Sequence, residues 1–187
     1  MNRKVFRLAA LLAAVQVVSL ATVAPVALAA ATDKASAGLG FKGIGARVGL
    51  VDPEGGSSTV TLGAHIDAGE FVEHVHLTPY AEYWSVGVSG VADTKDFTVA
   101  SDVTVDFPLQ GGSLTPYAGG GLGLHFLRLP PSIPGDPTRT RLGLGIQGGI
   151  KNQVMPNFGF FGEVRWSFVK EADQLKLVGG FTYNFIY

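Results

Sequence analysis

The chain has 187 residues, of which 14 are basic, 15 are acidic and 26 are glycine, and it contains no cysteine. This length suits one domain, the near-neutral charge gives no sign of nucleic-acid binding, and the lack of thiols excludes disulfide and thiolate chemistry. The glycines do not follow the G-X-Y period of collagen, and no segment after residue 30 has the ~20 uninterrupted apolar residues that a membrane-spanning helix needs.

The first 30 residues have the pattern of an export signal. Arg3, Lys4 and Arg7 form a positive start, an apolar run follows over residues 8–20, and small residues lead to the Ala-Leu-Ala of residues 27–29. A secretory signal peptide with an A-x-A cleavage site has this layout, and an uncleaved membrane anchor is the alternative. We predict a signal peptide over residues 1–30 and one mature domain over residues 31–187.

Eight segments of the mature region alternate apolar residues with small or polar ones, which is the period-two pattern of β-strands. Turn residues, such as the Asp-Pro-Glu-Gly-Gly of residues 52–56, separate the segments. Most segments approach the ~9–11 residues that a tilted strand needs to cross a bilayer. They cover residues 40–51, 59–67, 76–88, 97–107, 115–127, 139–150, 158–168 and 175–187. An even number of strands lets both chain ends lie on one side of a barrel.

A five-residue string occurs twice in this series. Residues 77–81 read LTPYA, and the same letters return at residues 114–118, 37 positions later. Two strands with their turns account for that spacing, so we expect both copies at the same rim. Duplication and local convergence both explain the repeat.

Two closed barrels fit the alternation, and they differ in which face points inward. A soluble, lipocalin-like barrel turns its apolar face inward, whereas a membrane barrel turns that face toward lipid and fills its lumen with small and polar side chains. Glycine weakens a strand but relieves crowding inside a narrow tube. Aromatic residues near the ends of the apolar face suit an interfacial girdle: Phe97, Phe107, Phe126, Phe158, Trp166, Phe168 and Tyr187. We predict an all-β, eight-stranded antiparallel up-and-down transmembrane β-barrel.

Three strings carry a resemblance to a known family. PYAGGGLGLHF (residues 116–126), GEVRWSF (162–168) and the ending GGFTYNFIY (179–187) resemble the outer-membrane β-barrel superfamily that includes OmpA, OmpX and opacity-type porin-like proteins. The resemblance implies an outer-membrane location and a first strand that closes the barrel on the eighth. It also implies that Gly180, Tyr183, Phe185 and Tyr187 form the signal for the barrel-assembly machinery.

Charged residues on the inward face must pair or be hydrated in a narrow lumen. The predicted inward set is Glu82, Asp102, Glu163, Arg165 and Lys176, together with His65. Because the third and seventh strands lie opposite each other, we expect Arg165 to reach Glu82, with Glu163 and Asp102 as alternative or additional partners. Such a network is either a fixed polar plug or a gate over a narrow water path.

A basic group falls at the rim that we expect to be extracellular. Arg128, Arg139 and Arg141 lie there with Lys170 and Lys176. Arginine binds phosphate with two hydrogen bonds, so this rim is suited to binding the phosphates of lipopolysaccharide. A merely solvated loop is the alternative.

The sequence has few features of an enzyme. The candidate histidines for a lipid A-modifying enzyme are His125 and His65, and His74 and His76 with Glu73 form the one cluster with metal-like spacing. No Walker, dinucleotide or zinc signature is present. We therefore expect a monomeric envelope-integrity or surface-interaction protein without catalytic residues, cofactor or metal. The alternatives are a narrow porin-like channel and a lipid A-modifying enzyme.

Overall fold

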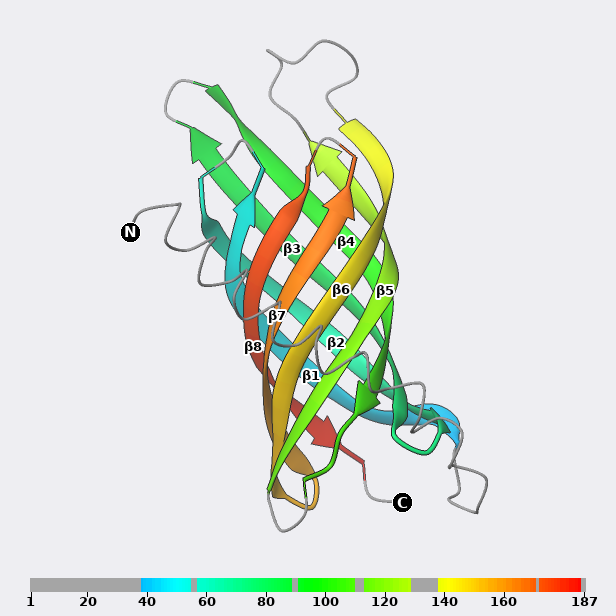
Figure 1. The fold of residues 1–187 in the computed structure, drawn as a ribbon. Helices are drawn as coiled ribbons and strands as arrows, with labels where there is room; N and C mark the ends of the chain where they lie inside the picture. The colour runs from blue at the N-terminus through cyan, green and yellow to red at the C-terminus, as the bar shows by residue number, and fades with distance from the viewer. Residues whose placement is uncertain are drawn as a thin grey trace.

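The computed structural model describes residues 38–54, 57–88, 91–109, 113–128, 138–170 and 172–185, so the predicted signal peptide lies outside the described residues. The strands are β1 (Leu39–Pro53), β2 (Thr59–Val72), β3 (Val75–Val88), β4 (Val91–Asp106), β5 (Leu114–Arg128), β6 (Thr138–Met155), β7 (Phe158–Val169) and β8 (Gln174–Asn184). They form one closed barrel in which each strand pairs with the next (Figure 1). Over these residues, no helix is long and apolar enough to cross a membrane.

All eight predicted segments are strands, and several run further than the sequence pattern indicated. β2 continues to Val72, where a two-residue turn leads directly into β3. His74 in that turn has a φ of 66°, the left-handed conformation that tight hairpin turns demand. These predicted ends were too short because strand pairing continues past the last alternating residue, where turn-forming residue types begin. The fourth and eighth segments were instead predicted to end too late, at residues 107 and 187, since β4 ends at Asp106 and β8 at Asn184. β8 ends there because its neighbour β7 begins at Phe158, opposite Tyr183.

β8 pairs antiparallel with β1 from Gly43↔Asn184 to Pro53↔Gln174, so the expected closure of the barrel by its first and last strands is confirmed. The C-terminal end of β8 lies at the same end of the barrel as the β2–β3 and β6–β7 turns (Figure 1). The longest connection, residues 129–137, joins β5 to β6 at the opposite end. Outer-membrane barrels have short periplasmic turns and longer extracellular loops, so the end with the C-terminus is periplasmic.

Both copies of LTPYA lie at the start of a strand and at the periplasmic end, as predicted. The first begins two residues into β3, and the second begins β5. In each copy the tyrosine, Tyr80 or Tyr117, faces the lumen and is 8% exposed.

The outer surface of the barrel is apolar along most of its height. Large hydrophobic side chains there are about half exposed or more, for example Leu62 at 60%, Leu142 at 66% and Phe160 at 50%. Aromatic pairs stand on the same face, including Trp166 stacked on Phe168 with ring centroids 5.7 Å apart. A soluble barrel would bury these groups, so the lipocalin-like alternative is wrong and the apolar face points toward lipid.

Candidate functional site

Arg165 on β7 is the centre of a charged network in the middle of the lumen. Its guanidinium donates to both carboxylate oxygens of Asp102 on β4 and, at 3.0 Å, to Glu163. It also donates to the hydroxyl of Tyr80, whose ring lies 4.4 Å from the guanidinium carbon. Arg165 is 1% exposed, so this bidentate pair is held away from water, where charge-assisted hydrogen bonds are strong.

Glu82 is paired differently from the prediction. Lys176 Nζ donates to Glu82 at 2.6 Å, and Arg47 Nε lies 2.9 Å from its other oxygen. Arg47 also bonds Glu163. The expected Arg165–Glu82 pair is therefore not formed. The stagger of strands in a barrel offsets the inward residues of facing strands, which brings Glu82 to Arg47 and Lys176.

Glycines act as spacers between partners that are two strands apart. Gly63 on β2 pairs with Arg47 on β1 and with Glu82 on β3. A Cβ at Gly63 would lie 2.7 Å from Glu82 Cγ and 3.1 Å from Arg47 Cγ, so the ion pair crosses β2 because that position has no side chain. Glycine lies between two bonded side chains at two further places: Gly149 between Tyr117 and Glu163, and Gly45 between His65 and Thr182.

Sequence reasoning missed three members of the network: Arg47, Tyr80 and Tyr117. Tyr117 donates to Glu163 at 2.8 Å, and the Tyr80 ring lies between the guanidiniums of Arg47, at 4.5 Å, and Arg165. The parity of β1 could have revealed Arg47, because it shares a face with the inward glycines of that strand. The repeated LTPYA could have revealed the two tyrosines.

A second, smaller polar cluster lies nearer the extracellular end. His125 Nδ1 is 2.8 Å from Asp96 and 2.9 Å from the Thr98 hydroxyl. The amide of Gln174 donates to the same Asp96 oxygen at 2.6 Å, and the indole of Trp84 donates to Gln174 at 3.3 Å. His125 is 3% exposed and faces the lumen, so it cannot reach an acyl chain in the surrounding bilayer.

Apolar side chains fill the lumen above this cluster. Val51, Trp84 and Val86 form one buried group, and Leu127, Val169 and Ala172 form another. These residues come from the extracellular ends of four strands and from the β7–β8 connection. The described part of the lumen therefore has an apolar layer at its extracellular end and an ionic layer at its centre.

The predicted basic rim divides into two groups with different orientations. Arg128 is exposed and pairs across strands with Lys95, on the outward face. Arg141 pairs with His125, and Arg139 pairs with Leu127, so both lie on the lumenal face of the β5–β6 hairpin.

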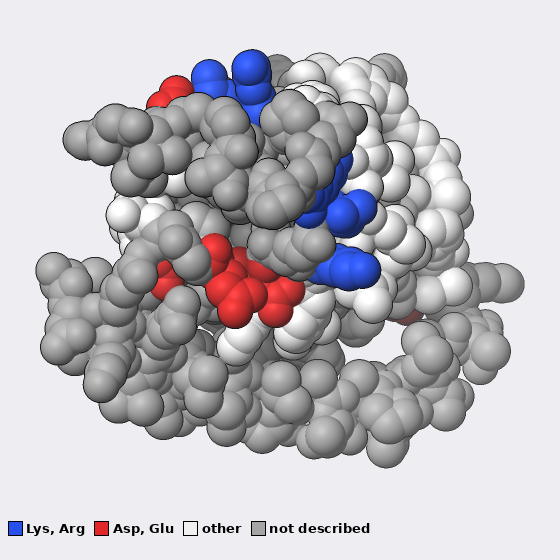
Figure 2. Space-filling view, turned by 90° about the horizontal axis from the view of Figure 1, so that it is seen from above, with Lys and Arg blue, Asp and Glu red and all other residues white. Residues whose placement is uncertain are grey.

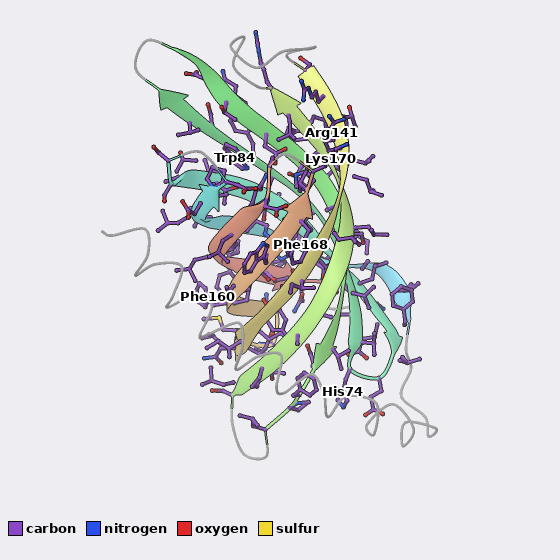
Figure 3. All side chains as sticks on the ribbon, turned by 45° about the horizontal axis from the view of Figure 1, so that its top comes forward. His74, Trp84, Arg141, Phe160, Phe168 and Lys170 are labelled. Atoms are coloured by element: carbon purple, nitrogen blue, oxygen red, sulfur yellow. The ribbon has the colours of Figure 1, made fainter. Side chains whose placement is uncertain are left out.

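Figure 3 shows Arg141 beside Lys170 at the loop end, with His74 at the opposite end. Seen from above, basic side chains gather at two places on the rim, and acidic side chains lie close to both (Figure 2). Lys176 was wrongly assigned to this rim, because it is 1% exposed and bonded to Glu82.

At the periplasmic end, His76 Nε2 lies 3.1 Å from both Glu70 and Asp106, and His74 lies 3.5 Å from Glu73. The described residues contain no group of three His, Cys, Asp or Glu side chains that could hold a metal ion. The two histidines therefore form separate ion-pair contacts rather than one cluster with Glu73.

The predicted assembly signal lies at the periplasmic end of β8. Tyr183 is 44% exposed on the outer face, and its ring lies edge-on to that of Phe185. Gly180 faces inward, where a Cβ would lie 2.6 Å from the Phe161 ring. Tyr187 lies outside the described residues.

No protein-family profile matches the chain, and no curated protein matches it in sequence. The crystal structure of Neisserial surface protein A is similar, with 20% identity, a TM-score of 0.64, and coverage of 79% of this chain and 99% of that one. The N-terminal β-barrel domain of Pseudomonas aeruginosa OprF has 17% identity, a TM-score of 0.57, and coverage of 78% and 99%. At these identities the likeness concerns the fold.

The chain therefore has the fold of the eight-stranded outer-membrane β-barrels. An apolar outer face and a closed ring of strands without a free edge are the two properties that let β-structure span a bilayer. The protein accordingly has the architecture of a barrel that spans a membrane.

Proposed function

We propose that this protein is a monomeric structural and surface-interaction barrel of the outer membrane, without catalytic or channel activity. The observation that supports this role most directly is that paired charges fill the centre of the lumen. Three cations and three carboxylates (Arg47, Arg165, Lys176, Glu82, Asp102 and Glu163) bond one another at its centre, each at most 5% exposed. Buried paired charges are costly to separate, so the network acts as a fixed plug.

Single-channel recording in planar bilayers tests the plug against the porin-like alternative. Wild-type protein and Arg165→Ala should both give silent traces, because the apolar layer at the extracellular end stays in place when the ionic layer is disturbed. Steps of conductance in the wild type would favour a channel. Steps in Arg165→Ala alone would show that the ionic layer is a gate.

The partner that we propose for the extracellular rim is the phosphate of lipopolysaccharide. Lys95 and Arg128 are cross-strand neighbours on the outer face, and the aromatic pair Phe97–Phe126 lies directly next to them toward the bilayer, with centroids 6.1 Å apart. Cations just above an interfacial aromatic pair lie at headgroup level. Arg139 and Arg141, on the lumenal face, are the weaker candidates.

Binding of purified lipopolysaccharide to the folded protein tests this contact. Each cation near an anionic surface contributes about 1 kcal/mol, so Lys95→Ala with Arg128→Ala should weaken binding roughly 30-fold. The matched control removes Arg139 and Arg141, which should cost much less. Unchanged binding in the first double variant would contradict the proposal.

A lipid-modifying activity has no support from the histidine that suggested it. His125 is enclosed in the lumen with Asp96 and Thr98, whereas lipid A lies outside the barrel. The mass of lipid A should stay the same when the protein is overproduced, and a change in acyl content would establish an enzyme.

We also propose that the assembly machinery recognises the end of β8 through Tyr183, Phe185 and Tyr187. The outward position of Tyr183 supports this role, because a partner can reach it from the lipid side. Replacing Tyr183 and Phe185 by alanine should lower the yield of folded barrel in cells while leaving refolding into vesicles intact. Equal losses in both assays would indicate a purely structural role.

A further inference from the structure

The periplasmic half of the lumen is a chamber that none of these roles uses. It has a volume of about 210 Å³. Its mouth lies among the periplasmic ends of the strands, and the central ionic layer closes its inner end. The walls carry mainly hydroxyl and amide groups: Thr78, Thr104, Thr182, Gln147, Asn152 and Asn184.

The cations of the chamber are already paired within the protein. Arg47, Asp102 and Glu163 form its inner wall, and all three belong to the central network. At the mouth, Lys151 Nζ lies 2.5 Å from Asp106. A further carboxylate on the wall, Asp67, accepts the Gly69 N–H at 2.8 Å. An anionic ligand would meet Asp67 and would have to break one of the ion pairs to reach a cation, and removing one partner of a buried pair is strongly unfavourable. The chamber therefore favours an uncharged ligand over an anionic one.

Several neutral polar atoms around the chamber can still form hydrogen bonds. His65 Nδ1, Asn152 Oδ1 and Asn184 Oδ1 are buried and have no hydrogen-bond partner in the protein. His65 is itself 5% exposed, and its other ring nitrogen bonds Thr182 at 2.9 Å. Unpaired buried polar groups cost about 1–3 kcal/mol each, so these atoms need hydroxyl partners from water or a ligand.

An aromatic ring also faces this polar space. Phe161 comes from the lumenal face of β7, and its ring stands edge-on to His65 at 5.3 Å and lies 5.7 Å from the Arg47 guanidinium. The Tyr117 ring lines the same chamber. Water gains nothing from an apolar wall, whereas a molecule with C–H groups on one side and hydroxyls on the other matches a wall of aromatic rings and amides.

We propose that this chamber binds a small uncharged polyhydroxylated molecule, of the size of a monosaccharide, that enters from the periplasm. The C–H groups of the ligand pack on Phe161, and its hydroxyls bond His65 and Asn184. Because the ionic layer closes the inner end, the ligand is held and not passed through the barrel.

Saturation-transfer NMR on the folded full-length mature protein tests the class of ligand. The detergent is lauryldimethylamine oxide, whose headgroup contains no sugar and so cannot occupy the chamber as a competitor. D-Glucose and D-mannitol should receive saturation from the protein, and D-gluconate should bind at least fivefold more weakly. No transfer to either neutral probe, or equal binding of a charged one, would overturn the proposal.

Variants test the location. Phe161→Leu should weaken binding of the neutral probe at least fivefold, and Phe168→Leu, on the lipid face of the same strand, should leave it unchanged. Asn184→Leu at the mouth should also weaken binding. Heat-modifiable gel migration shows whether each variant folds. If Phe161→Leu does not fold, Asn184→Leu alone tests the location. Full binding in the folded chamber variants would show that the probe sits elsewhere and would overturn the proposal.

Discussion

Arg165 is the side chain on which most of the lumenal bonds converge. It donates to Asp102 with both carboxylate oxygens as acceptors, to Glu163 and to Tyr80. These partners come from β4, β7 and β3 respectively. The side chain therefore ties β7 to β3 and β4 across the lumen, and its loss leaves carboxylates without their main cation.

Replacing Arg165 by alanine should lower the free energy of unfolding by about 3–5 kcal/mol, because a buried charge loses its partner. Urea titration of the protein folded in lipid vesicles measures this change. Adding Asp102→Asn to the variant should recover part of the loss, since one uncompensated charge disappears. Arg128→Ala, on the exposed rim, is the matched control and should stay within about 0.5 kcal/mol of wild type. Equal effects of Arg165→Ala and Arg128→Ala would contradict a buried network.

Glycines on the two faces of the barrel should respond oppositely to substitution. A Cβ at Gly121 would overlap the carboxylate of Asp102 and the Ser101 carbonyl, whereas Gly162 on the lipid face has nothing within 4 Å of its Cβ position. Gly121→Ala should therefore prevent or strongly weaken folding. Gly162→Ala should be neutral or stabilise the barrel by about 0.4–1 kcal/mol, because the unfolded chain loses freedom. Heat-modifiable gel migration and urea midpoints report both results, and similar midpoints for the pair would contradict the assigned faces.

Two strands, β3 and β5, contribute equivalent tyrosines through the same five-residue string. Tyr80 bonds Arg165 and Tyr117 bonds Glu163, so the repeat places one hydroxyl on a cation and the other on a carboxylate of one network. The spacer glycines also act between neighbouring strands. Gly63 and Gly149 lie on the strands between the bonded partners, which lets a side chain bridge two strands.

Tyr80→Phe and Tyr117→Phe should each cost about 1–3 kcal/mol, because each leaves a buried charged partner with one bond fewer. The ring of Tyr80 remains between the two guanidiniums in its variant, so the measurement isolates the hydroxyl. Tyr83→Phe, half exposed on the lipid face, is the control and should change the urea midpoint little. If Tyr83→Phe lost as much stability as the lumenal variants, the assignment of inward and outward side chains on β3 would be contradicted.

The alternation of the sequence predicts the strands, their number and the inward face, because a strand has only two faces and lipid demands one kind of side chain on the outer one. Pairing inside the lumen is harder to predict. The stagger between strands and the reach of long side chains over glycine decide which charges meet, so Glu82 pairs with Arg47 and not with Arg165. The inward position of Trp84 could not be predicted from the alternation either, because apolar residues occupy both faces of the extracellular end of β3.

At the scale of the whole molecule, the barrel is stratified along its axis. An apolar layer around Trp84 lies at the extracellular end, the ionic layer around Arg165 at the centre, and the open chamber at the periplasmic end. The outside is apolar along most of the height of the strands. Such a molecule is held by lipid on its outer face and by paired charges within, as the structural role that we propose requires.

The two tryptophans test the inside-out arrangement most directly, since Trp84 is 1% exposed in the lumen and Trp166 stands on the outer face against Phe168. The measurement is tryptophan fluorescence of Trp84→Phe and Trp166→Phe barrels folded in vesicles of lipids with brominated acyl chains. Trp84→Phe, which retains Trp166, should be strongly quenched, and Trp166→Phe should keep most of its emission. Strong quenching of Trp84 with little quenching of Trp166 would contradict the account.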